Sequence, residues 1–176
     1  MEKAKQQHFL ELYEPVHNQL TKFCRAISGN VEDAEDLMND TLLASFENFE
    51  KIRDISLFKS YVFSIASNLN KKKFRRKKFK AEFNEKDLHQ IIDLGKNPEQ
   101  IVEFNMIYEK ILQLPQKMSE ALILFYMNDL TLEEIQKIQG GSLSGVKQRI
   151  KRGREKLFSL LDTPEQIKLA TMLFTL

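Results

Sequence analysis

The sequence predicts an all-α fold, because apolar residues recur at helical spacing along almost the whole chain and strand-like alternation is missing. Glycine and proline, the residues that most often end helices, are scarce, with 6 and 4 of them among 176 residues. Hydrophobic residues make up 42% of the chain and charged residues 30%, which is normal for a folded, soluble protein. The length allows one ordinary domain or two small ones, each with its own core.

Three helices are predicted in the N-terminal half. Residues 8–28 carry one apolar stripe and form a single helix or a broken pair, and Gly29 and Asn30 then provide a stop and a new N-cap. The next helix covers about 31–49. Acidic residues in its first turns stabilise the positive end of the helix dipole, and its buried face consists of Ala34, Leu37, Met38, Thr41, Leu42, Ser45, Phe46 and Phe49. A third helix begins near Ser56 and runs into a basic block.

A weakly patterned stretch at about 79–97 predicts a linker between two domains. Within the second domain, helices are expected over 99–112 and from Pro115 onward. The C-terminal tail is a short amphipathic helix that either caps the second domain, the preferred interpretation, or binds a partner. The predicted organisation is therefore two small helical domains over 1–80 and 99–161, a linker over 81–98 and a tail over 162–176.

The last two helices of the second domain form a helix-turn-helix pattern. Thr131 with Glu134 three residues on predicts a capping box, and Gly140 and Gly141 then break the helix. Ser142 or Ser144 starts the next helix, which buries Val146, Ile150 and Leu157 and exposes Lys147, Gln148, Arg149, Lys151, Arg152 and Arg154. A short helix, a glycine turn and a helix with a basic outer face are typical of major-groove DNA binding.

Charge is strongly segregated along the chain, although the formal net charge is only +2. Residues 32–40 form an acidic block, residues 71–80 a dense basic block, and residues 147–156 a second basic block. The run at 71–80 alone fits a solvated helix end, a membrane-surface patch or a nonspecific phosphate contact equally well. Because each predicted domain carries one basic element, the two together favour DNA as the partner.

No motif in the sequence points to catalysis, a metal or a cofactor. The three histidines lack metal-ligand spacing, and neither a G-x-S-x-G nor a phosphate-binding G-x-x-x-x-G-K-[ST] motif is present. Cys24 is the only cysteine, which excludes an internal disulfide and favours a small buried apolar role. We therefore expect a protein that is not an enzyme and has no cofactor and no small-molecule substrate. The charged start and the lack of an apolar run of about 20 residues predict a cytoplasmic location.

Three segments carry recognisable motifs: residues 33–46, DAEDLMNDTLLASF; residues 58–68, FKSYVFSIASN; and residues 130–157, LTLEEIQKIQGGSLSGVKQRIKRGREKL. They resemble, in the same order, three conserved patterns of the extracytoplasmic-function (ECF) sigma factors, the two-domain branch of the sigma-70 family of bacterial transcription initiation factors. The patterns are D-A-E-D-L-x-Q-E-T-F-L-x-A-W of region 2.2, F-x-x-W-L-x-x-I-A-x-N before a basic stretch, and L-S-x-E-E-I-A-x-x-L-G-x-S-x-G-T-V-K-S-R-L-x-R-A-R-x-x-L of region 4. The resemblance covers both predicted domains.

The resemblance implies a sigma region 2 helical bundle followed by a sigma region 4 helix-turn-helix domain. Such a protein binds core RNA polymerase, through the β′ clamp helices and the β flap, and directs promoter-specific transcription initiation while polymerase supplies the chemistry. The residues that would dock on the clamp helices are Asp33, Asp36, Leu37, Asn39 and Asp40. The resemblance also implies an anti-sigma factor, in some cases linked to a membrane, that holds the protein inactive.

Double-stranded and melted promoter DNA are the other implied partners. At the −10 element, Asn68 would contact an unpaired base captured from the melted strand, and the phosphates would be held by Lys71, Lys72 and Arg75. At the −35 element, the base edges would be met in the major groove by Ser144, Lys147, Gln148 and Arg149, with Arg152 nearer to phosphate.

The sequence departs from the family pattern mainly around the helix-turn-helix. Gln136 and Gln139 replace small and leucine-like residues, while Gly141 and Gly145 replace a turn hydrophobe and a threonine. Glycine near the start of a helix lowers its stability by up to ~1 kcal/mol, which predicts a helix-turn-helix that is loosely held without DNA or a partner.

Two alternatives from other functional classes remain open. The first is a helix-turn-helix regulator that binds DNA as a dimer and never engages polymerase, but it has no evident need for the acidic helix at 33–40. The second is a degenerate sigma-like interaction protein that binds polymerase or an anti-sigma factor without reading promoters. Its only support is the altered turn at 140–145.

Overall fold

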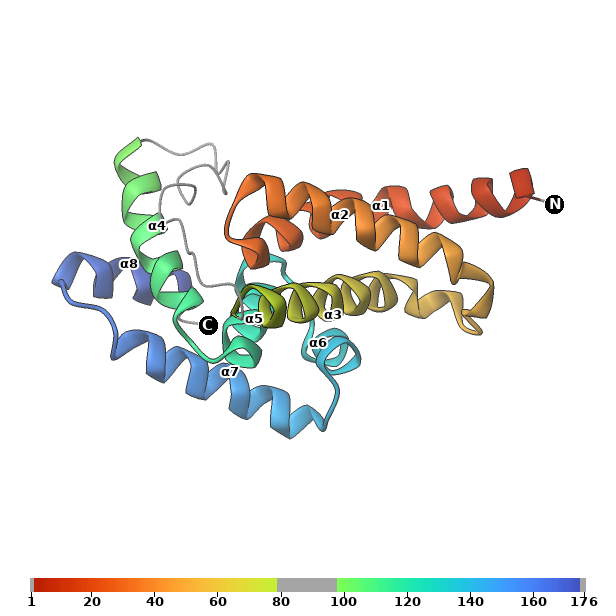
Figure 1. The fold of residues 1–176 in the computed structure, drawn as a ribbon. Helices are drawn as coiled ribbons and strands as arrows, with labels where there is room; N and C mark the ends of the chain where they lie inside the picture. The colour runs from red at the N-terminus through yellow and green to blue at the C-terminus, as the bar shows by residue number, and fades with distance from the viewer. Residues whose placement is uncertain (1, 79–97, 175–176) are drawn as a thin grey trace. The chain divides into compact units, whose positions relative to one another are not determined.

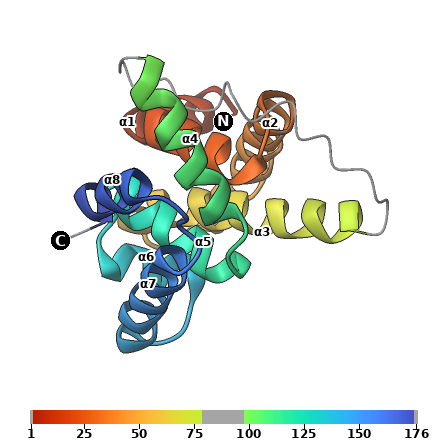
Figure 2. The ribbon, with the colours of Figure 1, turned by 90° about the vertical axis from the view of Figure 1, so that its left-hand side faces the viewer.

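The chain folds into two compact helical units, Met1–Asp87 (unit 1) and Leu88–Leu176 (unit 2) (Figures 1 and 2). The structure is a computed structural model that describes residues 2–78 and 98–174, without the side chains at 2, 74–78 and 98–103. Every regular element in the described residues is a helix, so the predicted all-α class is confirmed. The predicted linker lies almost wholly outside the described residues, and the bounds of the two domains, the linker and the tail stay predictions.

Unit 1 is built from three long helices, α1 (Glu2–Ser28), α2 (Val31–Glu47) and α3 (Phe58–Lys78), with short 3-10 turns at Phe49–Lys51 and Ile55–Leu57. Each helix packs against the other two (Figure 1). Aromatic rings fill the space between them: Phe9 meets Phe49 and Phe58 edge to face at centroid distances of 5.4 and 5.5 Å. Such pairs add to the stabilisation that comes from burying apolar area alone.

Local signals set the helix ends of unit 1. Asn30 is the N-cap of α2, as predicted, and its Oδ1 accepts a 2.7 Å hydrogen bond from the backbone N–H of Asp33. The first helix is continuous, with Pro15 inside it, and begins earlier than predicted. Asn70 of α3 is 8% exposed and donates from Nδ2 to the carbonyl of Ile27 at 2.9 Å, so α3 satisfies a carbonyl at the end of α1.

Unit 2 contains α4 (Pro98–Leu112), α5 (Gln116–Leu122) continued by a π-helical turn at Ile123–Met127, α6 (Leu132–Gln139), α7 (Leu143–Phe158) and α8 (Pro164–Phe174). Helix α7 packs closely on α5 at the buried Gly153, where an added Cβ would lie 3.3 Å from Leu122 Cγ. Helix α8 packs against α4 and α7 and buries Ala170 and Phe174. The tail helix thus covers part of the core of unit 2.

Across the described parts of both units, the helices are too short or too polar to cross a membrane.

Candidate functional site

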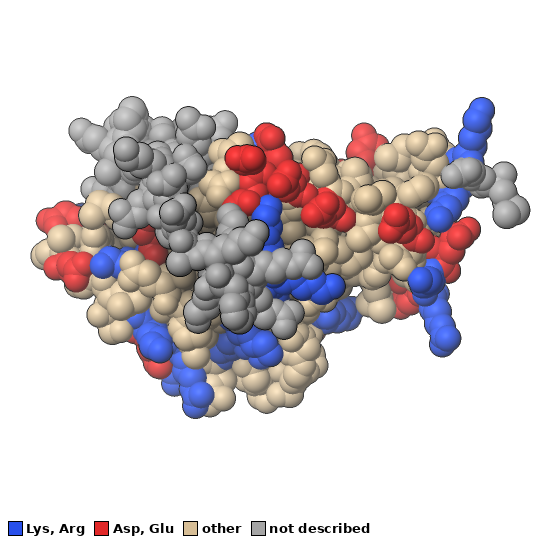
Figure 3. Space-filling view, in the orientation of Figure 1, with Lys and Arg blue, Asp and Glu red and all other residues tan. Residues whose placement is uncertain are grey.

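The acidic start of α2 divides into a buried and an exposed face. Leu37 is only 2% exposed and lies in the core of unit 1, whereas Asp36, Asn39 and Asp40 are exposed. Asp33 lies between the two faces, with its side chain 14% exposed. Figure 3 shows acidic side chains gathered at the end of unit 1 where α2 begins. Of the five residues predicted to dock on polymerase, three therefore lie open on one surface and Leu37 supports that surface from within.

Lys73 of α3 bridges to this acidic start. Its Nζ lies 2.8 Å from Asp33 Oδ1 and 3.4 Å from Asp36 Oδ2, and Asn30 Nδ2 donates to the other oxygen of Asp33 at 2.6 Å. Burial lowers the pKa of the Lys73 ammonium, but the hydrogen bonds and charges of the two carboxylates outweigh burial and raise the pKa overall. Lys73 is therefore part of the predicted basic block in the sequence, but in the folded protein it forms ion pairs with acidic residues of α2.

The predicted −10 contacts lie along one side of α3. Asn68, Lys71 and Lys72 stand at positions i, i+3 and i+4 of the helix, which places them on one face, and Arg75 follows at i+7. Asn68 and Lys72 are exposed, and Lys71 is partly buried and donates from Nζ to Ser67 Oγ at 2.6 Å. The side chain of Arg75 lies outside the described residues. The side chains that the structure describes here are the amide of Asn68 and the ammonium groups of Lys71 and Lys72.

The helix-turn-helix is formed by α6, a glycine turn and α7, as predicted. The capping box at the start of α6 is present, because Thr131 N–H donates to Glu134 Oε2 at 2.8 Å and Glu134 N–H to Thr131 Oγ1 at 3.2 Å. Gly140 and Gly141 have φ of 73° and 90°, a region that side chains disfavour. Ser142, the first of the two predicted starts, is the N-cap of α7.

The two glutamines that depart from the family pattern both form hydrogen bonds, Gln136 to the turn itself and Gln139 to helix α5. Gln136 Nε2 donates to the carbonyl of Gly141 at 3.0 Å, and Gln139 Nε2 donates to Glu120 Oε2 at 3.0 Å. Gly145 N–H donates to Ser142 Oγ at 3.1 Å, which satisfies one of the first amides of α7. The expectation of a loosely held helix-turn-helix, which rests on the low helix propensity of Gly145, stays a prediction.

The predicted −35 contacts share the outer face of α7. Ser144, Lys147, Gln148 and Arg152 are exposed, while Val146 and Leu157 on the opposite face are fully buried. Arg149 differs from the others, because it is partly buried and its Nη1 donates to Gln139 Oε1 at 2.5 Å. The structure thus brings all five predicted residues onto one helix and gives Arg149 a partner within the unit.

Three residues with a place in these surfaces were missed by the sequence analysis. Leu43 is 59% exposed on the same side of α2 as Asn39 and Asp40, and counting at 3.6 residues per turn could have found it. The partnerships of Lys73 and Gln139 join residues far apart in the chain, and no local signal could have found them.

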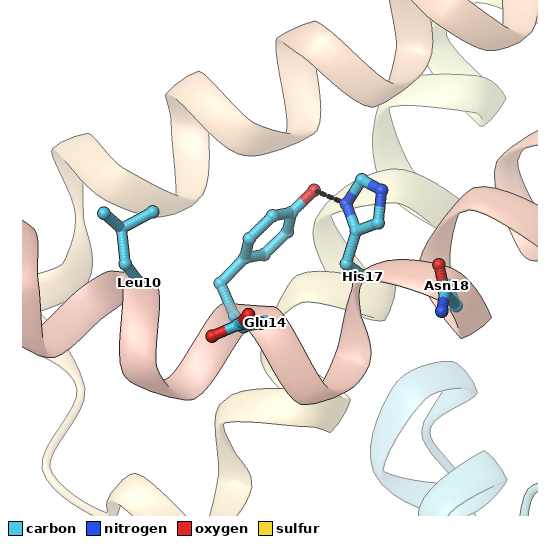
Figure 4. Close-up of a pocket in the computed structure, with 5 residues that line it drawn as sticks. Leu10, Glu14, His17 and Asn18 are labelled. Carbon is cyan, nitrogen blue, oxygen red and sulfur yellow. Dashed lines mark hydrogen bonds between the residues drawn. The ribbon is translucent and has the colours of Figure 1, made fainter.

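An open pocket lies along α1, lined by Leu10, Tyr13, Glu14, His17 and Asn18 (Figure 4). The Tyr13 hydroxyl and His17 Nδ1 share a 2.9 Å hydrogen bond, drawn as the dashed line. Burial, with a smaller contribution from the nearby Cys24, raises the pKa of the Tyr13 phenol. All five residues come from one helix, and no predicted site residue is among them.

Comparisons with known proteins match both units. The family model for "Sigma-70 region 2" matches residues 12–80, and that for "Sigma-70, region 4" matches residues 104–157. The ECF RNA polymerase sigma factor SigW of Bacillus subtilis (strain 168) is 30% identical over 169 residues, which cover 89% of this chain and 90% of that protein. EcfG of Rhodopseudomonas palustris (strain TIE-1), also an ECF RNA polymerase sigma factor, is 31% identical over 144 residues, covering 81% and 78%.

Two solved structures show the same fold. The sigma factor RpoE in complex with the anti-sigma factor NepR from Bartonella quintana matches with a TM-score of 0.70 and 22% identity, over 93% of this chain and 99% of that one. CnrH in complex with the cytosolic domain of CnrY matches with a TM-score of 0.68 and 20% identity, over 92% of each chain.

A region 2 bundle followed by a region 4 helix-turn-helix defines the sigma-70 class of transcription initiation factors. Because its full-length relatives are ECF sigma factors, the chain belongs to the ECF RNA polymerase sigma factors. The predicted family and the predicted role in directing transcription initiation are confirmed. Neither the dimeric regulator nor the degenerate sigma-like protein is favoured.

Proposed function

We propose that this sigma factor docks on the β′ clamp helices of core RNA polymerase through the exposed face of α2. Asp36, Asn39 and Asp40 supply polar contacts, and the 59% exposed Leu43 adds an apolar contact. Asp33 lies at the edge of this surface. The buried Leu37 acts indirectly by holding the helix in the core. The observation that carries the proposal is the grouping of acidic and apolar side chains on a helix face that unit 1 leaves open.

The exposed face of α3 is the proposed −10 surface. The side-chain amide of Asn68 can both donate to and accept from a base edge, which suits the capture of one unpaired base. Lys71, Lys72 and Arg75 are proposed to hold the neighbouring phosphates, because extruding a base costs a few kcal/mol that phosphate contacts help to offset. The alignment of Asn68, Lys71 and Lys72 on one face of α3 supports this assignment.

The outer face of α7 is the proposed −35 surface. Ser144, Lys147, Gln148 and Arg149 are proposed to meet base edges in the major groove, and Arg152 to meet phosphate. The exposure of four of these five side chains supports the proposal. Polymerase carries out all bond chemistry, so no catalytic residue is assigned to this chain, and its proposed place of action is the cytoplasm, where polymerase and DNA meet.

Two further partners are proposed. One is the β flap of polymerase, which the resemblance to region 4 suggests. The other is an anti-sigma factor, because RpoE and CnrH, which share this fold, were each solved with such a regulator or a part of one.

The docking proposal is tested by pull-down of bacterial core RNA polymerase with the full chain and with the double variant Asp36→Arg plus Asp40→Arg. Circular dichroism confirms that each variant is folded. We expect the double variant to lose polymerase, whereas a matched charge reversal at two exposed acids of α1, Glu11→Arg plus Glu14→Arg, retains it. If the α2 variant binds polymerase as well as the wild-type protein does, this face is not the docking surface. If the wild-type protein does not bind polymerase yet retards DNA, the sigma-factor assignment fails and the dimeric regulator becomes the preferred interpretation.

A further inference from the structure

Gln139 occupies the centre of a hydrogen-bond relay that joins three helices of unit 2. Its Nε2 donates to Glu120 Oε2 of α5 at 3.0 Å and to the carbonyl of Lys117 at 3.2 Å. Its Oε1 accepts from Arg149 Nη1 of α7 at 2.5 Å. Glu120 is 4% exposed, so the relay runs from a nearly buried carboxylate to a residue on the DNA-facing helix.

The chemistry of the relay fixes which way the Gln139 amide points. A carboxylate oxygen and a backbone carbonyl only accept hydrogen bonds, so both must face the NH2 end of the amide. The carbonyl end is thereby directed at the guanidinium of Arg149, which only donates. The Glu120 carboxylate and the Lys117 carbonyl therefore both accept from the amide NH2, and the Arg149 guanidinium donates to the amide oxygen. Reversing the amide would place these two acceptors against its oxygen.

Holding Arg149 in this way has a consequence for DNA recognition. An arginine side chain that is free in solution loses rotamer freedom when it binds, and this loss opposes binding. Arg149 is already partly ordered, and its guanidinium has five N–H donors, of which this bond uses one. The remaining donors can form the two parallel hydrogen bonds with which arginine selects guanine in the major groove.

We propose that Gln139 is a positioning residue for promoter selectivity: anchored by Glu120, it orients Arg149 toward a guanine of the −35 element. This inference rests on the proposed −35 role of Arg149 and adds the residue that sets its orientation. Gln139 itself touches no DNA in this scheme. Gln136 provides a natural contrast, because it bonds to the turn at Gly141 without bonding to Arg149.

The experiment measures the base preference of holoenzyme, assembled from core polymerase and the full chain, on promoters randomised at the −35 element. Arg149→Ala should lower the preference for guanine at one position by about tenfold, the size of a lost bidentate contact. Gln139→Met, which keeps the length of the side chain but neither hydrogen bond, should lower the preference at that same position severalfold. In the Arg149→Ala background, Gln139→Met should have no further effect on it. Gln136→Met should leave it unchanged.

A second variant separates positioning from a loss of folding. Glu120→Gln keeps an acceptor for Gln139 Nε2 while removing the carboxylate charge, so it should retain the guanine preference even where it lowers the Tm of the protein. The proposal is overturned if Gln139→Met leaves the preference intact, or if it changes the preference equally with and without Arg149. If Arg149→Ala changes no −35 preference, the proposed role of Arg149 in reading DNA fails, and the positioning role fails with it.

Discussion

Replacing Lys73 by methionine removes the ion pair between α3 and the start of α2 while keeping the length of the side chain. The Lys73 and Asp33 side chains are 34% and 14% exposed and 2.8 Å apart. Well-formed hydrogen bonds to charged groups contribute about 1.5–3 kcal/mol, and solvent-exposed ion pairs about 0.2–1 kcal/mol. This partly buried pair lies between those limits, so Lys73→Met should cost about 1 kcal/mol. Asp33 keeps its hydrogen bond from Asn30, so it is not left buried without a partner.

The assay is a double-mutant cycle of Lys73→Met with Asp33→Asn in the full chain, followed by hydrogen exchange of the α2 amides under mild urea. We expect a coupling energy of about 1 kcal/mol, whereas Lys72→Met, an exposed neighbour, should stay within about 0.5 kcal/mol of wild type. Because folding raises the pKa of Lys73, the coupling is complete below the unfolded value of about 10.4 and is lost as the pH rises through the folded value. A coupling energy near zero at pH 7 would refute the reasoning.

Three further predictions concern stability, each measured by urea or thermal unfolding of the full chain. Burial raises the pKa of the Cys24 thiol from 9.0 to about 12, so stability should fall by about 1.4 kcal/mol per pH unit across that interval, and Cys24→Ala should remove this part of the slope. Thr131→Ala should cost about 1 kcal/mol by removing the capping box of α6; an equal loss with the exposed Lys137→Ala would count against a capping effect. Gly153→Leu should cost about 1–3 kcal/mol or more, because its side chain has no space beside Leu122, and an unchanged Tm would contradict that packing.

The helices and their ends were largely predictable from local signals. The capping box at Thr131, the N-cap at Asn30 and the glycine turn at Gly140 all act within four residues, so the sequence displays them directly. The motif matches likewise predicted the family and its two units. The early start of α1 was missed, and the choice between a single helix and a broken pair stayed open, because a proline lowers helix propensity locally while the packing of the whole helix on α2 and α3 overrides it.

The candidate surfaces were predictable only in outline. Helical spacing places Asn68, Lys71 and Lys72 on one face of α3, and both Leu37 and Asp36 near the start of α2. Spacing also placed Leu37 on the buried face of α2, and the structure confirms that it is in the core. Leu43, which was not predicted as part of the docking surface, is exposed beside Asn39 and Asp40.

By itself, the sequence determined the helical class, the order of the two matched regions and the basic outer face of α7, because these depend on periodicity, capping and composition along the chain. Only the tertiary structure decided the partners of individual charged groups. Lys73 and Lys72 are adjacent in sequence, yet one is paired with Asp33 and the other faces solvent. Gln139 and Glu120 are 19 residues apart and meet only because α5 and α6 fold together. The physical reason is that a hydrogen bond or ion pair depends on distance in space, which packing sets and sequence spacing does not.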